Sequence, residues 1–388
     1  MELRPQEAAG FADKVYAINA TQTRAGALLL KDLLKDKIFS QKNTASSLTA
    51  TVGGNLLLSA MDGFGLCTMG GKGYEGDLFL IFRGTTTANN KADFVTDGNI
   101  GLTSSSTGQM VHVGFNNTFT SMLPQIRTFL AKNKVTGTVH CIGHSLGGAV
   151  ASLAADWLKK KAGKSVKLYT FGAPRVGTYF FAKSTTDNLK VENIHRVYHK
   201  TDPVPMVALF PFMQAPYNSN GHFIESSELV FSGAAHKMGK YVESVRSKSW
   251  TALNSVPDEP YNVEWAIEQW LNSKRYTSAD SHTFLRWAES ALIYVLKKIG
   301  ISVVAALQGA VMGVATLADK LAYILSKGID LADNISYWVV RFMRRIMQAL
   351  GMKVAASKEE LTRGVIRTAL LRLTRKNYDN AQRAIRKL

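Results

Sequence analysis

The 388-residue sequence contains only two cysteines, Cys67 and Cys141. Two are too few for a disulfide framework, and their spacing matches no zinc or redox motif, so we expect both to be small buried hydrophobic residues. Prolines are scarce as well, nine in all, and the 31 glycines follow no period, which excludes a fibrous or low-complexity protein. With 46% hydrophobic and only 20% charged residues, disorder of the whole chain is also excluded.

Acidic residues are the other deficit. The chain has 29 Asp and Glu against 47 Lys and Arg, which gives a formal charge of +18. Residues 341–388 hold 13 basic and 3 acidic residues, a net +10, so more than half of the surplus lies in the last 48 residues. This charge suits docking on an anionic membrane surface or an acidic partner. Nucleic acid is not expected, because no recognition motif accompanies the basic residues.

The order of sequence patterns predicts an α/β domain followed by a helical region. Residues 1–50 are expected to be a helical lead-in, and a helix is expected over 146–162 between two predicted strands. Strand, helix and strand at this spacing indicate a mostly parallel central sheet. After about residue 250 only helical patterns remain, so the predicted division is 1–250 and 251–388. Short runs rich in β-branched or aromatic residues predict strands at 78–82, 138–142, 167–171 and 194–198.

The sharpest chemical signal is Gly143-His144-Ser145-Leu146-Gly147, placed where a strand must turn into a helix. A serine at such a turn is held in a strained conformation that lifts its hydroxyl clear of the sheet, and the flanking glycines leave room for the turn. Ser145 is therefore the candidate nucleophile. The amide of Leu146, at the start of the new helix, is positioned to bind a developing oxyanion.

A serine nucleophile needs a base, and the base needs an orienting acid. Asp202 follows the strand 194–198 directly, so it lies at the same sheet edge as the elbow and is our candidate acid; the alternative is an Asp that only caps a turn. Asp187, in a polar loop, and Asp156, on the helix after the elbow, are placed less well.

Two histidines follow the acid, as the chain order of an elbow-type hydrolase requires. His236 lies in a loop of small residues that opens a helix, which suits an imidazole that must reach two other loops. His222 precedes a strand-like run and is better explained as a structural hydrogen-bonding residue. His236 is therefore favoured as the base.

These features resemble the class 3 lipase family, whose members have the α/β-hydrolase fold. The resemblance covers about 75–245 and implies that Thr85 supplies the second oxyanion donor, that about 86–106 form a lid, and that no metal or organic cofactor is needed. Phe94 departs from the tryptophan that is more frequent in the family. The motifs that carry the resemblance are Leu80–Thr85, Ala92–Asp97, Val111–Phe115, the elbow, Thr170–Gly177, Asp202–Pro205, and His236 with Tyr241.

The helical region offers two interpretations. Ile299–Ala318 contains 20 residues without a charge, which is long enough to cross a bilayer but equally typical of a helix buried under its neighbours. Beyond it, one helical face carries Ile335, Trp338, Val339, Phe342 and Ile346, and another carries Arg341, Arg344 and Arg345; 361–373 repeats the pattern. Such helices suit an anionic membrane interface, or they pack on the hydrolase with a solvated basic face.

The leading hypothesis is a lipolytic serine hydrolase that cleaves carboxylic esters of membrane phospholipids. A lipase-like core, a basic helical tail and no Sec-type amino terminus are together similar to type VI secretion lipase effectors, which are antibacterial toxins. That similarity implies synthesis in the cytoplasm, export by a non-Sec route, action at the target-cell membrane or periplasm, and a cognate immunity protein. The alternatives are an intracellular triacylglycerol lipase or carboxylesterase, and a toxin that perturbs membranes through its C-terminal helices.

Overall fold

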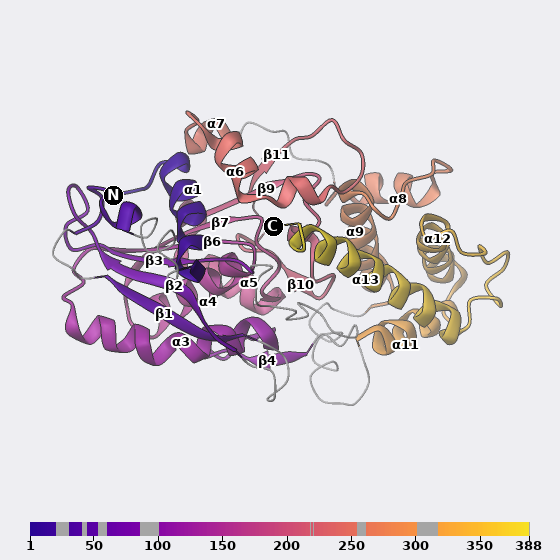
Figure 1. The fold of residues 1–388 in the computed structure, drawn as a ribbon. Helices are drawn as coiled ribbons and strands as arrows, with labels where there is room; N and C mark the ends of the chain where they lie inside the picture. Colours follow the sequence, from indigo (N-terminus) through magenta and orange to yellow (C-terminus); the bar gives the residue numbers. More distant parts are fainter. Residues whose placement is uncertain are drawn as a thin grey trace.

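A mostly parallel sheet forms the centre of the computed structural model, which describes residues 1–20, 31–40, 45–52, 60–85, 101–217, 219, 221–253, 261–300 and 317–387. Within these ranges the sheet has seven strands in the order β1-β2-β3-β6-β7-β9-β11 (Figure 1). The strands from β3 to β11 are parallel, while β1 and β2 form an antiparallel edge. The strands are β1 (Ser46–Val52), β2 (Ala60–Met69), β3 (Leu78–Phe82), β6 (Thr138–His144), β7 (Ser165–Phe171), β9 (Ile194–His199) and β11 (His222–Ile224). All four predicted strands are confirmed.

Both faces of this sheet are covered, which explains why its strands are continuous apolar runs. In β3, Leu80 belongs to one buried hydrophobic cluster and Phe79 to the cluster on the opposite face. Cys67 and Cys141 are free, buried and part of the first cluster, as the sequence predicts. The helices α3 (Val113–Lys132), α4 (Leu146–Lys160) and α5 (Tyr179–Leu189) contribute to that cluster, and α1 (Pro5–Lys14) and α6 (Met238–Val245) to the other. A smaller antiparallel sheet has the order β10-β8-β5-β4 and consists of β4 (Leu102–Ser104), β5 (Met110–His112), β8 (Gly177–Thr178) and β10 (Phe212–Met213).

The helical lead-in is predicted correctly only in its first part. The helix α1 and the 3-10 helix η1 (Val15–Ala20) open the chain, but Ser46–Val52 is a strand rather than the end of the helical segment. The reason is visible in this stretch: Leu48, Ala50 and Val52 recur at every second position between serines and threonines, the period of a strand with one buried face. Residues 21–30, which include part of the predicted helical run, lie outside the described residues.

The C-terminal region is helical over its described residues, as predicted. Its helices build an apolar cluster that also takes in Met206 and Phe210 from the hydrolase part of the chain. They lie beside one end of the sheet (Figure 1). The division at residue 250 stays a prediction, since packing alone does not define an independent domain. The helices of this cluster are α8 (Glu264–Asn272), α9 (His282–Lys298), α11 (Leu317–Ile329), α12 (Asp333–Ala349) and α13 (Arg363–Ile385). The short helix α7 (Trp250–Leu253) belongs instead to the cluster of α1 and α6.

The predicted apolar face of α12 is buried inside this cluster: Val339, Phe342 and Ile346 are all fully or almost fully buried. The expectation that Arg341, Arg344 and Arg345 share a solvated face is wrong for Arg345. This side chain is buried, and its guanidinium donates to the carbonyl oxygens of Ser273 (3.1 Å) and Arg275 (2.7 Å). Helical periodicity failed here because adjacent residues lie about 100° apart, so the edge of a wide buried face can include a basic residue.

Most of the uncharged stretch 299–318 lies outside the described residues, which omit 301–316. In the part of the chain that the structure does describe, no helix is both long and apolar enough to cross a membrane.

Candidate active site

Three side chains from three loops meet in one hydrogen-bonded chain. The hydroxyl Oγ of Ser145 lies 2.8 Å from Nε2 of His236, and Nδ1 of His236 lies 2.7 Å from Oδ2 of Asp202. Ser145 follows β6, Asp202 follows β9, and His236 ends the 3-10 helix η4 (Gly233–His236). Both β6 and β9 are parallel strands, so their carboxyl ends share one edge of the sheet, and the acid and the nucleophile meet there.

The backbone at Ser145 has the strained geometry that the elbow motif predicts. Ser145 has φ 55° and ψ −127°, a conformation that a residue with a side chain rarely adopts. A side chain at Gly143 would lie 2.2 Å from the carbonyl oxygen of Gly147, and one at Gly147 would lie 2.3 Å from that of Phe82. The two flanking glycines are therefore required by close backbone contacts on both sides of the turn.

Thr85 and Leu146 both lie at this turn. Leu146 is the first residue of α4, so its amide has no partner inside the helix. A Cβ on Gly84 would lie 3.0 Å from the Cβ of Ser145, which places the backbone before Thr85 against the nucleophile. The buried guanidinium of Arg83 holds this turn by donating to the carbonyl oxygens of Gly63 (2.5 Å) and Gly84 (2.8 Å). Among the described residues, the buried Thr85 hydroxyl has no hydrogen-bond partner, so it is available to an oxyanion.

The Asp202 carboxylate accepts hydrogen bonds from two further donors. Tyr241, on α6, donates its hydroxyl to Oδ2 (2.6 Å), and the amide of Val204 donates to Oδ1 (2.9 Å). Burial and the nearby Asp202 charge raise the pKa of Tyr241 well above its usual value, so the phenol stays protonated and keeps donating. The amide of Ser232 donates to the carbonyl of Thr201 (2.8 Å), which ties the acid loop to the base loop. This network fixes the acid relative to the imidazole.

His144, next to the nucleophile, positions the backbone of the base. Its Nε2 lies 2.8 Å from the carbonyl oxygen of His236, and its Nδ1 lies 2.6 Å from the hydroxyl of Tyr16. Burial lowers the pKa of His144 well below its usual value, so the ring is neutral. A neutral ring that donates from Nε2 must accept at Nδ1, where the Tyr16 hydroxyl donates. No sequence signal assigns this role to His144 or marks Tyr16, because nothing in a helical lead-in indicates a contact 128 residues away.

The rejected candidates lie elsewhere. His222 begins β11, which lies on the far side of β9 from β7. Its ring stacks on that of His195 and is tilted against that of Trp250, with the ring centres 4.9 Å apart. Asp156 is buried and accepts from Thr185 (3.0 Å), while Asp187 is exposed and pairs with Lys183 (2.6 Å). Among the described residues, neither carboxylate is hydrogen-bonded to an imidazole. The structure therefore brings Ser145, Asp202 and His236 together and leaves the other candidates outside.

Ser145 and His236 are 0% exposed, so both side chains are closed off from solvent in this conformation. The predicted lid, about 86–106, and the Phe94 within it lie mostly outside the described residues, which omit 86–100. Its described end forms β4, paired with β5, and Leu102 packs against the buried cluster that contains Val204 and Val207. In the described part of the chain, no group of three or more His, Cys, Asp and Glu side chains is arranged to hold a metal ion.

Parallel strands, a serine on a strained strand-to-helix turn, and an acid and a base from later loops define an α/β-hydrolase. A sequence model of the class 3 lipases matches residues 79–212, so this segment is similar to that family. The secreted mono- and diacylglycerol lipase 1 of Fusarium solani is 35% identical over 134 residues, 33% of this chain and 38% of the relative. Toxin TseL of Vibrio cholerae serotype O1 is 35% identical over 103 residues, 26% of this chain and 15% of the toxin. The chloroplastic phospholipase A(1) DAD1 of Arabidopsis thaliana is 34% identical over 127 residues, 28% of each chain.

The family match is confined to the hydrolase core. The chain spans about two fifths or less of the length of these curated relatives, and the helices after residue 250 lie outside the family match. The family therefore describes the core, while the activity of the whole chain is a separate question.

Two buried histidines other than His236 lead us to expect that the protein becomes less stable in acid. Burial lowers the pKa of His195 to about 4 and that of His282 to about 3, whereas an unfolded histidine titrates near 6.5. Below pH 6.5 these two histidines therefore bind protons in the unfolded chain but not in the folded protein. Their contribution to stability is fully present above pH 6.5 and is lost as the pH drops toward 4. We expect the free energy of unfolding to fall by roughly 4 kcal/mol between pH 7.5 and 5 from these two rings together.

Urea titrations across this pH range measure the effect. His282→Gln removes one of the two titrating rings, so its curve should lose about half of that dependence. A midpoint that stays constant from pH 7.5 to 5 would contradict the prediction.

Proposed function

We propose that the chain is a lipolytic serine hydrolase that cleaves carboxylic esters of membrane lipids with Ser145, His236 and Asp202. The observation that carries the proposal is the continuous hydrogen-bonded chain from Ser145 Oγ through both ring nitrogens of His236 to Asp202. The class 3 lipase match of residues 79–212 supports the same reaction type.

In this mechanism the Ser145 hydroxyl attacks the ester carbonyl while Nε2 of His236 takes its proton. The Asp202 carboxylate holds the hydrogen of Nδ1 and stabilises the imidazolium that forms. The amide of Leu146 and the Thr85 backbone and hydroxyl donate to the oxyanion of the tetrahedral intermediate. His236 then protonates the leaving alcohol, and water hydrolyses the acyl-enzyme by the same steps in reverse.

Phospholipid is the proposed substrate. The similarity to a phospholipase A(1) supports it, and a basic surface attracts an enzyme to anionic bilayers. The similarity to a mono- and diacylglycerol lipase favours a second candidate, acylglycerol hydrolysis. Rates on phosphatidylglycerol vesicles, triacylglycerol emulsion and a short soluble ester separate the two. Turnover of phosphatidylglycerol supports the first, and turnover of acylglycerol alone would replace it.

We further propose that the chain is an antibacterial effector exported by a type VI secretion route, acts at the membrane or periplasm of the target cell, and is blocked by an immunity protein. The similarity to a protein named as a toxin supports this, together with the basic charge. Expression directed to the periplasm of a test bacterium should stop growth, and Ser145→Ala should abolish the effect. Killing and liposome leakage that survive in Ser145→Ala would instead favour a toxin that acts through its C-terminal helices.

The packing of α13 limits which part of the basic tail is accessible to a membrane. The apolar side of α13 is buried, with Ile366 and Leu373 in the helical cluster and Ala381 and Ala384 against the acid and base loops. Asn377 also donates to the carbonyl of Met206 (2.9 Å), near the acid. This helix supports the active-site loops, so its deletion would disturb the site itself. Only its basic side is free for docking.

Charge reversal on α13 should therefore weaken vesicle binding without unfolding the chain. Arg372 and Arg375 on α13 and Arg386 at its C-cap are exposed, so replacing these three arginines by Glu lowers the net charge of one face by six units. Each basic residue near an anionic surface contributes about 1 kcal/mol, so we expect flotation with phosphatidylglycerol vesicles to weaken at least 100-fold.

The matched control makes the same change of charge on the hydrolase part of the chain. Lys132, Lys134 and Lys159 are exposed on the hydrolase part, and their replacement by Glu should affect flotation much less. Equal binding by the two triple variants would show that α13 is not the docking face.

A further inference from the structure

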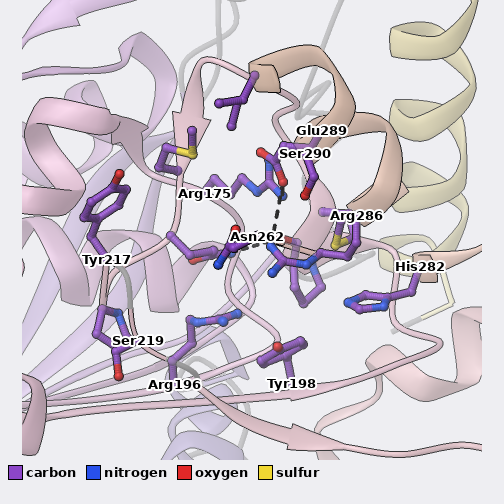
Figure 2. A pocket seen from close by; sticks show the side chains of 16 residues that line it. Arg175, Arg196, Tyr198, Tyr217, Ser219, Asn262, His282, Arg286, Glu289 and Ser290 are labelled. Atoms are coloured by element: carbon purple, nitrogen blue, oxygen red, sulfur yellow. Dashed lines mark hydrogen bonds and ion pairs between the residues drawn. The ribbon is translucent and has the colours of Figure 1, made fainter. Parts of the chain in front are cut away.

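A second site lies between the hydrolase core and the helical region. A cavity of about 220 Å³ opens between β9 and the first turns of α9, and neither Ser145 nor His236 lines it (Figure 2). Arg196 comes from β9, Arg175 from the loop after β7, and His282 and Arg286 from one side of α9. Figure 2 shows these side chains extending toward the same space. We call it the arginine pocket.

Positive charge exceeds negative charge in this pocket. Its lining contains the guanidinium groups of Arg175, Arg196 and Arg286 and one carboxylate, Glu289. Glu289 is already engaged: Arg175 donates to both of its oxygens (2.6 and 2.9 Å), and Arg286 lies 3.8 Å from it. Because His282 is neutral near pH 7, the pocket keeps a net charge of two positive units. Burial, together with the positive charges of Arg286 and Arg175, lowers the pKa of Arg196.

Several buried nitrogens of the pocket have no hydrogen-bond partner among the described residues. They are Nε of Arg175, Nε of Arg196 and both ring nitrogens of His282. These side chains are 2%, 8% and 7% exposed, so bulk water does not satisfy them. A buried donor without an acceptor destabilises a fold, and a cluster of such donors normally has a bound partner.

The surroundings hold Arg196 and define the shape of a ligand. The guanidinium of Arg196 lies 4.0 Å from the centre of the Tyr198 ring, and a Cβ on Gly221 would lie 2.9 Å from its Nε. Arg196 is therefore fixed from two sides. Met206, Met213 and Ile293 add an apolar wall next to the charged one. The cavity thus offers donors for several oxygens at one end and room for a short organic group at the other.

We propose that the arginine pocket binds a phosphate group, carried by a small phosphomonoester or by a phospholipid head group. Guanidinium groups arranged around one space match the oxygens of a tetrahedral phosphate, and the neutral His282 supplies one further N–H donor. This site is separate from the proposed hydrolysis. It shares a wall, Pro205 and Met206, with the loop that follows Asp202.

Calorimetry of the full chain with inorganic phosphate and with sn-glycerol 3-phosphate tests the proposal. We expect saturable binding that Arg286→Gln and His282→Gln each weaken at least tenfold. The matched control is Arg341→Gln: Arg341 lies over the Tyr337 ring at 5.0 Å, as Arg286 lies over Tyr261 at 5.0 Å, but it is outside the pocket. The control should bind as the wild type does. Thermal melts confirm that each variant is folded.

Vesicles of phosphatidylcholine with and without phosphatidic acid identify the source of the phosphate. Binding of the soluble anions indicates a free phosphomonoester, whereas binding that is confined to phosphatidic acid vesicles and sensitive to Arg286→Gln indicates a lipid head group. If no probe binds saturably, or if binding is unchanged in both pocket variants, the proposal is wrong. Hydrolysis by the same preparations is scored separately, so loss of the pocket and loss of the active site remain distinguishable.

Discussion

Replacing Asp202 by asparagine should lower kcat for ester hydrolysis by about 10⁴-fold while leaving the fold intact. The amide keeps the size of the carboxylate and can still accept from Val204. Its NH₂ group, however, would face Nδ1 of His236, 2.7 Å away, and would favour the tautomer that carries its proton on Nε2. That tautomer cannot take the proton of Ser145. The readout is kcat on a soluble ester, with the circular dichroism spectrum as a check on folding.

Asp187→Asn is the matched control, since it makes the same change in an exposed carboxylate that pairs with Lys183. We expect it to retain the wild-type kcat. A kcat in Asp202→Asn within tenfold of the wild type would show that another group orients the base.

Gly172→Ala should reduce kcat by at least 100-fold, although the substitution adds a single methyl group. Gly172 has φ +55°, and a Cβ there would lie 2.7 Å from Oδ2 of Asp202, 2.9 Å from the hydroxyl of Tyr241 and 3.1 Å from Nδ1 of His236. The methyl group would therefore push apart the groups that hold the imidazole, and a displacement of about 1 Å at a catalytic group lowers the rate roughly 100-fold.

Gly163→Ala separates this contact from backbone strain. Gly163 has φ +63°, but a Cβ there meets no atom within 4 Å. Both variants should lose about 1 kcal/mol of stability from the left-handed backbone, and only Gly172→Ala should lose activity. Full activity in Gly172→Ala, measured by kcat on the same ester, would contradict the described geometry.

Features that depend on a few neighbouring residues could be predicted from the sequence. The run Leu78–Phe82 is apolar at every position because both faces of a parallel sheet are covered, and the predicted strand matches β3 at both ends. The turn at Ser145 depends on glycines two residues away on either side, so a motif of five residues was enough to predict it. Asp202 was predicted from its place after a strand, and the structure puts it 2.7 Å from His236.

Contacts between segments far apart in the chain could not be predicted from the sequence. Tyr16 reaches His144 from the first helical turns, and Asn377 reaches the carbonyl of Met206 from the last helix; neither residue belongs to a motif. The arginine pocket likewise combines Arg175, Arg196 and Arg286, which lie more than 100 residues apart at the extremes. The basic tail was located correctly by counting charges, but counting could not show that Arg345 is buried or that α13 packs on the catalytic loops.

The assignment of Ser145 as the nucleophile is the central claim, and covalent labelling tests it most directly. A fluorophosphonate reacts with a serine only where a neighbouring base activates the hydroxyl, and the modified peptide is identified by mass spectrometry. We expect one phosphonyl group per chain on the peptide that contains Ser145, none in Ser145→Ala, and slow labelling in Asp202→Asn. Labelling of a different serine, or ester hydrolysis that persists in Ser145→Ala, would contradict the account.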